Sequence, residues 1–155
     1  MHFITKKELG MKLAGIFMAI FIASSSIFAY DGNLKKDINV VIFLTKKDNF
    51  QSAILQANGI QKSLSSSEKG DIELVMGGSS VEIFAQNDEK SNKIKNDIAK
   101  LVDLPNVRVV ACRGAMKRAN VSQDSLIKGV NTVKAAPREV VDRQLDGYAI
   151  LILKN

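Results

Sequence analysis

Histidine, cysteine and tryptophan are almost missing from this sequence of 155 residues, which has one His, one Cys and no Trp. A single Cys cannot form a disulfide within its own chain. One Cys and one His also fall short of the four ligands that a structural zinc site needs. These scarcities exclude a disulfide framework and a structural zinc site built from this chain alone.

The start of the sequence has the pattern of a secretory signal peptide, a basic segment followed by an apolar one. Three lysines precede the uncharged residues 13–29, which end at the small residue Ala29. We therefore expect residues 1–29 to be cleaved, leaving a polar tail over 30–36 and one domain over 37–155. The alternative is an uncleaved membrane anchor, but the apolar stretch is short for a membrane span. Cleavage predicts a periplasmic protein that keeps no membrane segment.

Cleavage would remove His2, so the mature chain would contain no histidine. Metal sites and acid–base mechanisms that depend on imidazole are then excluded, including the Ser-His-Asp and Cys-His pairs. The net charge falls from +6 to +4 because three lysines and one glutamate leave. The remaining basic clusters have no neighbouring aromatic residues to stack bases, so nucleic-acid binding is not expected. We predict no metal site, and no haem, flavin or nucleotide cofactor.

Five apolar, mostly β-branched segments of the chain have the length and composition of buried strands. Helical spacing or turn residues occupy the intervals between them, with residues 113–121 expected to be a loop or a broken helix. Regular alternation of strand and helix predicts an α/β domain with a parallel sheet covered by helices on both faces. The predicted strands are 38–44, 72–76, 107–112, 130–135 and 148–153.

Ligands of such sheets bind beyond the carboxyl ends of the strands, where three loops of this chain should meet. These loops are 45–49, 77–80 and the segment that begins at Cys112. Asp48 or Asn49, in the first loop, can cap the next helix, and Asp48 could instead line the pocket. The sole cysteine therefore falls where chemistry is expected. Arg138 and Arg143, on the last helix, are expected to be solvated or at a subunit contact.

The segment 111–119, Ala-Cys-Arg-Gly-Ala-Met-Lys-Arg-Ala, resembles the DsrE/DsrF-like family, which includes sulfur-relay subunits. The glycine pair after the second strand and the closing Gln-Leu-Asp-Gly-Tyr-Ala, residues 144–149, are similar as well. The resemblance implies a three-layer α/β/α fold with a five-stranded parallel sheet. It also implies a homo-oligomer, a trimer or hexamer, and a protein donor or acceptor of sulfur.

Cys112 then has three interpretations. In the first it carries sulfur as a persulfide, as a sulfur carrier or sulfurtransferase accessory, which requires a thiolate. Without histidine, that thiolate would be stabilised by Arg113, Lys117, Arg118 and the backbone N–H groups around Gly114.

In the second interpretation Cys112 is incidental, and the same crevice binds a small anion or a partner protein. Gly77, Gly78 and Ser79 would present N–H groups to the anion, although they do not form a phosphate-binding motif. In the third, Cys112 is a small buried hydrophobic residue. The sequence leaves all three open.

Overall fold

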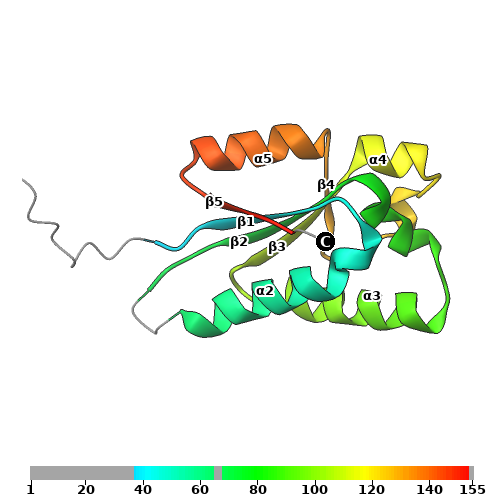
Figure 1. Ribbon diagram of the computed structural model, residues 1–155. Coiled ribbons are helices and arrows are strands. Elements are labelled where there is room, and N and C mark those ends of the chain that lie inside the picture. Colours follow the sequence, from blue (N-terminus) through cyan, green and yellow to red (C-terminus); the bar gives the residue numbers. More distant parts are fainter. Residues whose placement is uncertain (1–36, 65–67, 154–155) are drawn as a thin grey trace, which may run out of the picture. The chain divides into compact units, whose positions relative to one another are not determined.

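The computed structural model of the protein describes residues 37–64 and 68–153 (Figure 1). Five strands form one sheet in the order β4-β3-β2-β1-β5, and every neighbouring pair runs parallel. The predicted signal peptide and tail, residues 1–36, lie outside the described residues. The strands are β1 (Val40–Leu44), β2 (Ile72–Met76), β3 (Val107–Cys112), β4 (Asn131–Val133) and β5 (Ala149–Ile152).

The strands at the centre of the sheet are buried on both faces, which explains their nearly continuous apolar sequence. All five residues of β2 are buried, and β1 has one residue of intermediate exposure. The edge strand β5 is only partly covered, and its Ile152 is exposed. Each fully buried Leu, Ile or Val of the centre contributes about 1.5–3 kcal/mol relative to exposure.

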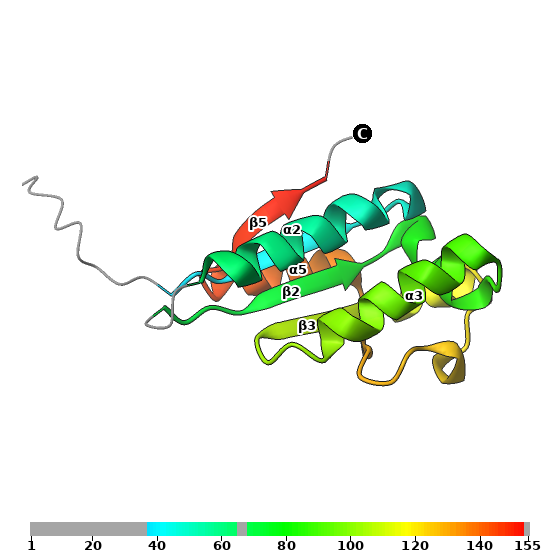
Figure 2. The ribbon, with the colours of Figure 1, turned by 90° about the horizontal axis from the view of Figure 1, so that it is seen from below.

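Helices cover both faces of the sheet, which confirms the predicted three-layer α/β/α architecture. In Figure 1, α4 and α5 lie on one side of the sheet and α2 and α3 on the other. Figure 2 shows α2 and α3 side by side across their face. The α-helices are α2 (Phe50–Ser63), α3 (Glu89–Val102), α4 (Arg113–Arg118) and α5 (Ala136–Leu145), and the short 3₁₀ segments are η1 (Lys47–Asn49), η2 (Gly78–Ala85) and η3 (Gln123–Ser125).

Local signals set several helix ends. Asp88 precedes α3, and its side chain accepts a hydrogen bond of 3.0 Å from the Ser91 backbone N–H. This bond and one from the Ser91 hydroxyl lower the pKa of Asp88. Pro137 lies in the first turn of α5, and Gly147 follows its end with φ +88°. Of the two residues expected to cap α2, Asp48 lies inside η1 and Asn49 occupies the position directly before the helix.

The described structure differs from the sequence prediction in two elements. Residues 113–118 form a regular helix. A helix this short does not need a long apolar stripe, because the burial of Ala115 and Met116 stabilises it. The fourth strand covers only 131–133 of the predicted 130–135, since it pairs only with the last three residues of β3.

Alternate residues of a strand point to the same face of the sheet. Arg108, Val110 and Cys112 of β3 therefore share a face, and Glu73 of β2 lies beside Arg108 in the register. This is the face under α5, since Arg143 of α5 forms an ion pair with Glu73. Arg108 and Cys112 are separated by roughly 13 Å along the strand. One face of the sheet thus carries a charged group at its amino end and a thiol at its carboxyl end.

Candidate functional site

Cys112 is the last residue of β3 and directly precedes the first turn of α4. The apolar run of β3 brings it to the carboxyl edge of the sheet, opposite Val133 of the neighbouring strand. Its side chain is a free thiol that is 6% exposed. The structure therefore places this cysteine at the predicted edge, with little direct access to solvent.

Gly114 lies beside the thiol, at a point that three other groups approach. A Cβ at this position would lie 3.7 Å from Cys112 Sγ, 3.8 Å from Arg118 Nη1 and 3.9 Å from the Lys134 carbonyl oxygen. The sulfur and the guanidinium thus face the same point. A Cβ would fit there without a clash, whereas a larger side chain would lie against both of them.

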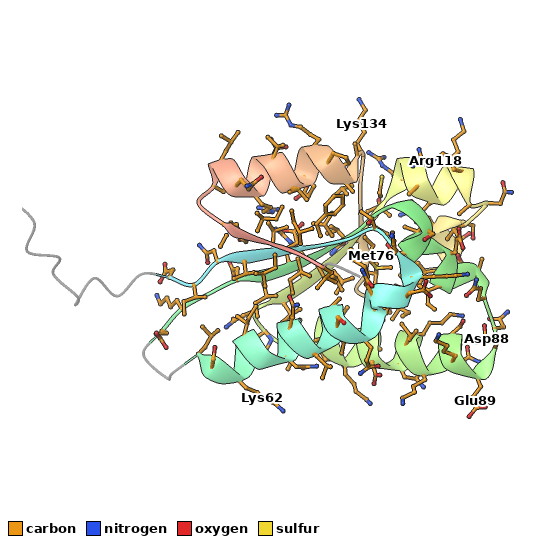
Figure 3. The ribbon with its side chains drawn as sticks, viewed as in Figure 1. Lys62, Met76, Asp88, Glu89, Arg118 and Lys134 are labelled. Carbon is orange, nitrogen blue, oxygen red and sulfur yellow. The ribbon has the colours of Figure 1, made fainter. Side chains whose placement is uncertain are left out.

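Positive charge gathers around α4 and is not neutralised within 37–64 and 68–153. Arg113, Lys117 and Arg118 are exposed and form no ion pair with any other described residue. Of these three, Arg118 approaches the point beside the sulfur, because its Nη1 lies 3.8 Å from the position of a Cβ on Gly114. Figure 3 labels Arg118 and Lys134 on the same side of the sheet.

Sequence reasoning missed Lys134. This residue follows β4, and the carboxyl end of β4 lies beside Cys112 because the two strands are parallel neighbours. The signal was its position just after a predicted strand, but a lysine before a helix is usually only a solvated charge. The backbone carbonyl of Lys134 approaches the same point beside the thiol, and its side chain is exposed.

The Gly77–Ser79 segment lies at the same edge, where η2 packs against α4. The Gly77 N–H donates to the Leu44 carbonyl at 2.9 Å, and the Ser80 N–H donates to the Gly77 carbonyl at 3.1 Å. The first of these bonds extends the sheet, so the Gly77 N–H is not available to an anion. A Cβ on Gly77 would lie 3.1 Å from the Ala136 Cβ, closer than side chains usually pack.

Gly78 has the stronger steric requirement. Its φ is +54°, and a Cβ there would lie 2.5 Å from the Thr45 carbonyl oxygen. Ser80 is buried, and its hydroxyl donates to the carbonyls of Leu44 and Gly77 at 3.0 and 2.7 Å. The glycine pair therefore serves close packing of the loops, while Ser79 stays partly exposed beside them. Cys112, Gly114 and Arg118 form the predicted group that the structure brings together.

Among the described residues, no group of three or more His, Cys, Asp or Glu side chains is arranged to hold a metal ion. No helix in this part of the chain is long and apolar enough to cross a membrane. The chemistry that the site offers is that of one thiol beside a guanidinium group.

Two solved structures have a similar fold, and both are described as proteins of unknown function. One, from Methanobacterium thermoautotrophicum, has a TM-score of 0.61 and 23% sequence identity; the match covers 76% of this chain and 100% of that one. The other, from Bacteroides thetaiotaomicron, has a TM-score of 0.55 and 16% identity, and it covers 74% of this chain and 94% of that one. At these identities the likeness concerns the fold alone.

A search of functionally curated proteins found no match to the chain. The model of one protein family does match, over residues 39–153, which includes all five strands and the segment around Cys112. The match spans most of the sequence and agrees with the parallel five-stranded sheet described above. The chain therefore belongs to the DsrE/DsrF-like family.

Proposed function

We propose that this protein is a sulfur carrier that holds a sulfane sulfur as a persulfide on Cys112. Membership of the DsrE/DsrF-like family suggests a role related to sulfur relay. The observation that carries the finer proposal is that the Cys112 sulfur and the Arg118 guanidinium lie 3.7 and 3.8 Å from the same point, the position of a Cβ on Gly114. A thiol and a cation that meet at one point suit the transfer of a single sulfur atom.

The transfer needs no change in the total number of electrons. The Cys112 thiolate attacks the outer sulfur of a donor persulfide, so that a new S–S bond forms at Cys112. The S–S bond of the donor breaks, and its inner sulfur leaves as a thiolate that takes up a proton. The positive end of α4 and the Arg118 guanidinium stabilise the negative charge on the attacking sulfur, in place of histidine.

Burial of the thiol sets a condition on the donor. Because Cys112 is 6% exposed, the donor has to deliver its sulfur to a largely buried thiol. The same burial protects the lone thiol from mixed disulfides in an oxidising compartment. A persulfide formed there would be shielded until an acceptor displaced it.

Intact-mass analysis after exposure to a panel of sulfane donors tests this proposal. We expect the protein to gain the mass of one sulfur atom, reversibly on reduction, and the Cys112→Ser variant to gain none. A Gly114→Val variant should gain sulfur far more slowly with its fold intact, since its side chain would lie against both the sulfur and the guanidinium. An unchanged mass with every donor, together with a thiol that reacts with labelling reagents only after unfolding, would contradict the proposal.

We also propose that the chain is exported to the periplasm after removal of residues 1–29. The support is the basic and then apolar pattern of that segment. Cell fractionation and the mass of the purified protein test both points. A full-length chain recovered from the cytoplasm would contradict them.

A homo-oligomer is the third part of the proposal. Val141 and Leu145 of α5 and Ile152 of β5 are large exposed apolar side chains, and Leu145 is 80% exposed. Such side chains are common where two subunits meet. Sedimentation analysis should give a trimer or hexamer that Leu145→Glu weakens, and a monomeric wild-type protein would refute this part.

A further inference from the structure

Positive charge is concentrated in one segment of the described chain. Residues 113–134, from the start of α4 to the residue after β4, contain five basic side chains and one acidic side chain. The other described residues contain eleven basic and thirteen acidic side chains. The excess positive charge of the described chain therefore lies entirely in the segment that directly follows Cys112.

The arginines of the protein show the same contrast. Outside α4, each described arginine pairs with at least one carboxylate, and these arginines are Arg108, Arg138 and Arg143. In α4, Arg113 and Arg118 form no ion pair with any residue in the described part of the chain. The first group is bound within the fold, whereas the second remains available to a negatively charged partner.

Four exposed cations on α4 and directly after β4 form what we call the basic patch, which consists of Arg113, Lys117, Arg118 and Lys134. Arg113 and Lys117 are four residues apart on a helix, a spacing at which like charges are neighbours and repel each other. Arg118 Nη1 and the Lys134 carbonyl oxygen lie 3.8 and 3.9 Å from the position of a Cβ on Gly114, so the residue after β4 lies against the helix. The patch is thus one surface beside the thiol, and a partner of opposite charge would relieve its internal repulsion.

The composition of this segment favours a protein surface as the partner. Residues 113–134 contain no aromatic side chain on which a nucleic-acid base could stack. The large exposed apolar side chains of the described residues all lie outside the segment, so it lacks the apolar contact that binding to a membrane surface uses. One small anion pairs with one or two cations, whereas four cations on two elements suit several carboxylates spread over a surface.

We propose that the basic patch docks a partner protein that presents a cluster of Asp and Glu side chains around the residue that carries its sulfur. This assignment rests on the sulfur-carrier function proposed above and names the surface by which the partner is recognised. Opposite charges speed the encounter of two proteins and orient them before contact. Because Cys112 is 6% exposed, few orientations of a partner bring its sulfur to the thiol, so orientation by charge has a large effect on the rate.

Fluorescence anisotropy of a labelled peptide of alternating Glu and Ser, measured with the purified protein, tests the docking surface without any sulfur transfer. We expect this peptide to bind at low salt, and a peptide of alternating Gln and Ser not to bind. Binding should disappear near 1 M salt, where the screening length is about 3 Å. A Gln peptide that binds as tightly as the Glu peptide would overturn the proposal.

Charge reversal locates the bound peptide. Lys117→Glu and Lys134→Glu should each weaken its binding several-fold, since each replaces an attraction by a repulsion. Lys62→Glu is the matched control, because Lys62 is an exposed lysine of α2 that Figure 3 shows on the opposite side of the sheet from Lys134. All three variants change the net charge equally, so a loss confined to the first two places the peptide on the patch. Equal weakening by Lys62→Glu would overturn the assignment.

Sulfur delivery separates this assignment from the sulfur-carrier function itself. Two persulfide peptides that differ only in having Glu or Gln around the same cysteine serve as donors, and intact mass follows the sulfur on Cys112. We expect the Glu peptide to react several-fold faster at low salt and the two rates to converge at high salt. Equal rates at low salt would overturn the docking surface and leave the sulfur carrier. Binding of the Glu peptide with no sulfur delivered by either donor would overturn the sulfur carrier and leave the docking surface.

Three further outcomes would assign the basic patch to a different occupant and overturn the proposal. Vesicles of anionic phosphatidylglycerol that bind more tightly than the Glu peptide would assign it to a membrane surface. Single-stranded DNA that binds more tightly would assign it to nucleic acid. Self-association that Lys117→Glu abolishes, measured by sedimentation, would assign it to a second copy of this chain.

Discussion

The two ends of the sheet face under α5 differ in how they hold polar groups beside the hydrophobic core. At the amino end, Glu73 is buried and both arginines beside it are engaged with its carboxylate. At the carboxyl end, Cys112 is buried, and Arg118, which approaches the same point as the Cys112 sulfur, forms no ion pair with a described residue. At the amino end the charged groups are paired with one another, whereas at the carboxyl end the Arg118 guanidinium is available to a reacting molecule.

The two ends also differ in what fixes their geometry. The amino end is held by side-chain ion pairs that join β2, β3 and α5. The carboxyl end is held by close approaches of backbone, such as Gly78 against Thr45. Mutations, pH and charge removal should therefore act differently on them, and four experiments can break or sharpen this contrast.

The largest expected effect is that of Arg143→Ala. Removing Arg143 leaves the buried carboxylate of Glu73 with Arg108 as its remaining partner, and the loss of this charged contact should cost about 3 kcal/mol of unfolding free energy. Arg138→Ala is the matched control, because Arg138 is on the same helix and pairs only with Asp142 on the surface. Urea denaturation should show no measurable change for that control. Equal losses for both variants would contradict the contrast.

Gly78→Ala should have the next largest effect, on the opposite end. The new Cβ would strike the Thr45 carbonyl oxygen, and φ is positive, so we expect a loss of about 2 kcal/mol. Gly147→Ala provides the comparison at the amino end, since φ is also positive there but nothing lies within 4 Å of the Cβ. It should cost about 1 kcal/mol in thermal or urea unfolding. A cost for Gly147→Ala as large as that for Gly78→Ala would refute the steric argument.

The effect of pH separates the ends further. Burial raises the pKa of Glu73 above its usual value of 4.5, and the two arginines only partly oppose the shift. A raised pKa favours the folded state when the group is protonated, so this contribution is complete below pH 4.5 and is lost as the pH rises through the raised pKa. The wild type should therefore gain stability relative to Glu73→Gln as the pH falls.

Asp88→Asn gives the opposite sign and serves as the control. The pKa of Asp88 is lowered, so its contribution is present above its usual value of 3.8 and is lost as the pH falls through the lowered pKa. Urea denaturation of the three proteins over pH 3 to 7, roughly the range in which carboxyl groups titrate, measures both trends. Parallel curves for wild type and Glu73→Gln would contradict the burial argument.

The smallest expected change in stability is that of Arg118→Met. The side chain is exposed and unpaired within the described residues, so unfolding should shift by less than about 0.5 kcal/mol. The rate at which Cys112 reacts with a sulfane donor should nevertheless fall several-fold. Lys128→Met, at an exposed lysine outside α4, is the control and should leave the rate nearly unchanged. Equal rates for the two variants would remove Arg118 from the proposed site.

The sequence predicted the sheet well because central parallel strands are apolar on both faces and leave long uninterrupted runs. It also placed Cys112 correctly, since the end of such a run marks the carboxyl edge. It left residues 113–121 open between a loop and a broken helix, because the six residues of α4 are too few for a helical period to be visible. It missed the role of Arg143 because the partner, Glu73, is distant in sequence. The one local sign of this ion pair was Glu73 itself, a carboxylate within the apolar run of β2. A single residue of this kind matches no motif.

The order of the strands has a consequence for how the chain folds. β1 pairs with β2 on one side and with β5 on the other, so its second edge stays open until residues 149–152 have been made. Pairing between such distant segments closes a long loop and is slow. During that interval β1 offers an apolar edge to other chains, which is a route to aggregation. Formation of the β1–β5 pair, between segments about a hundred residues apart, is therefore the step that removes this exposed edge.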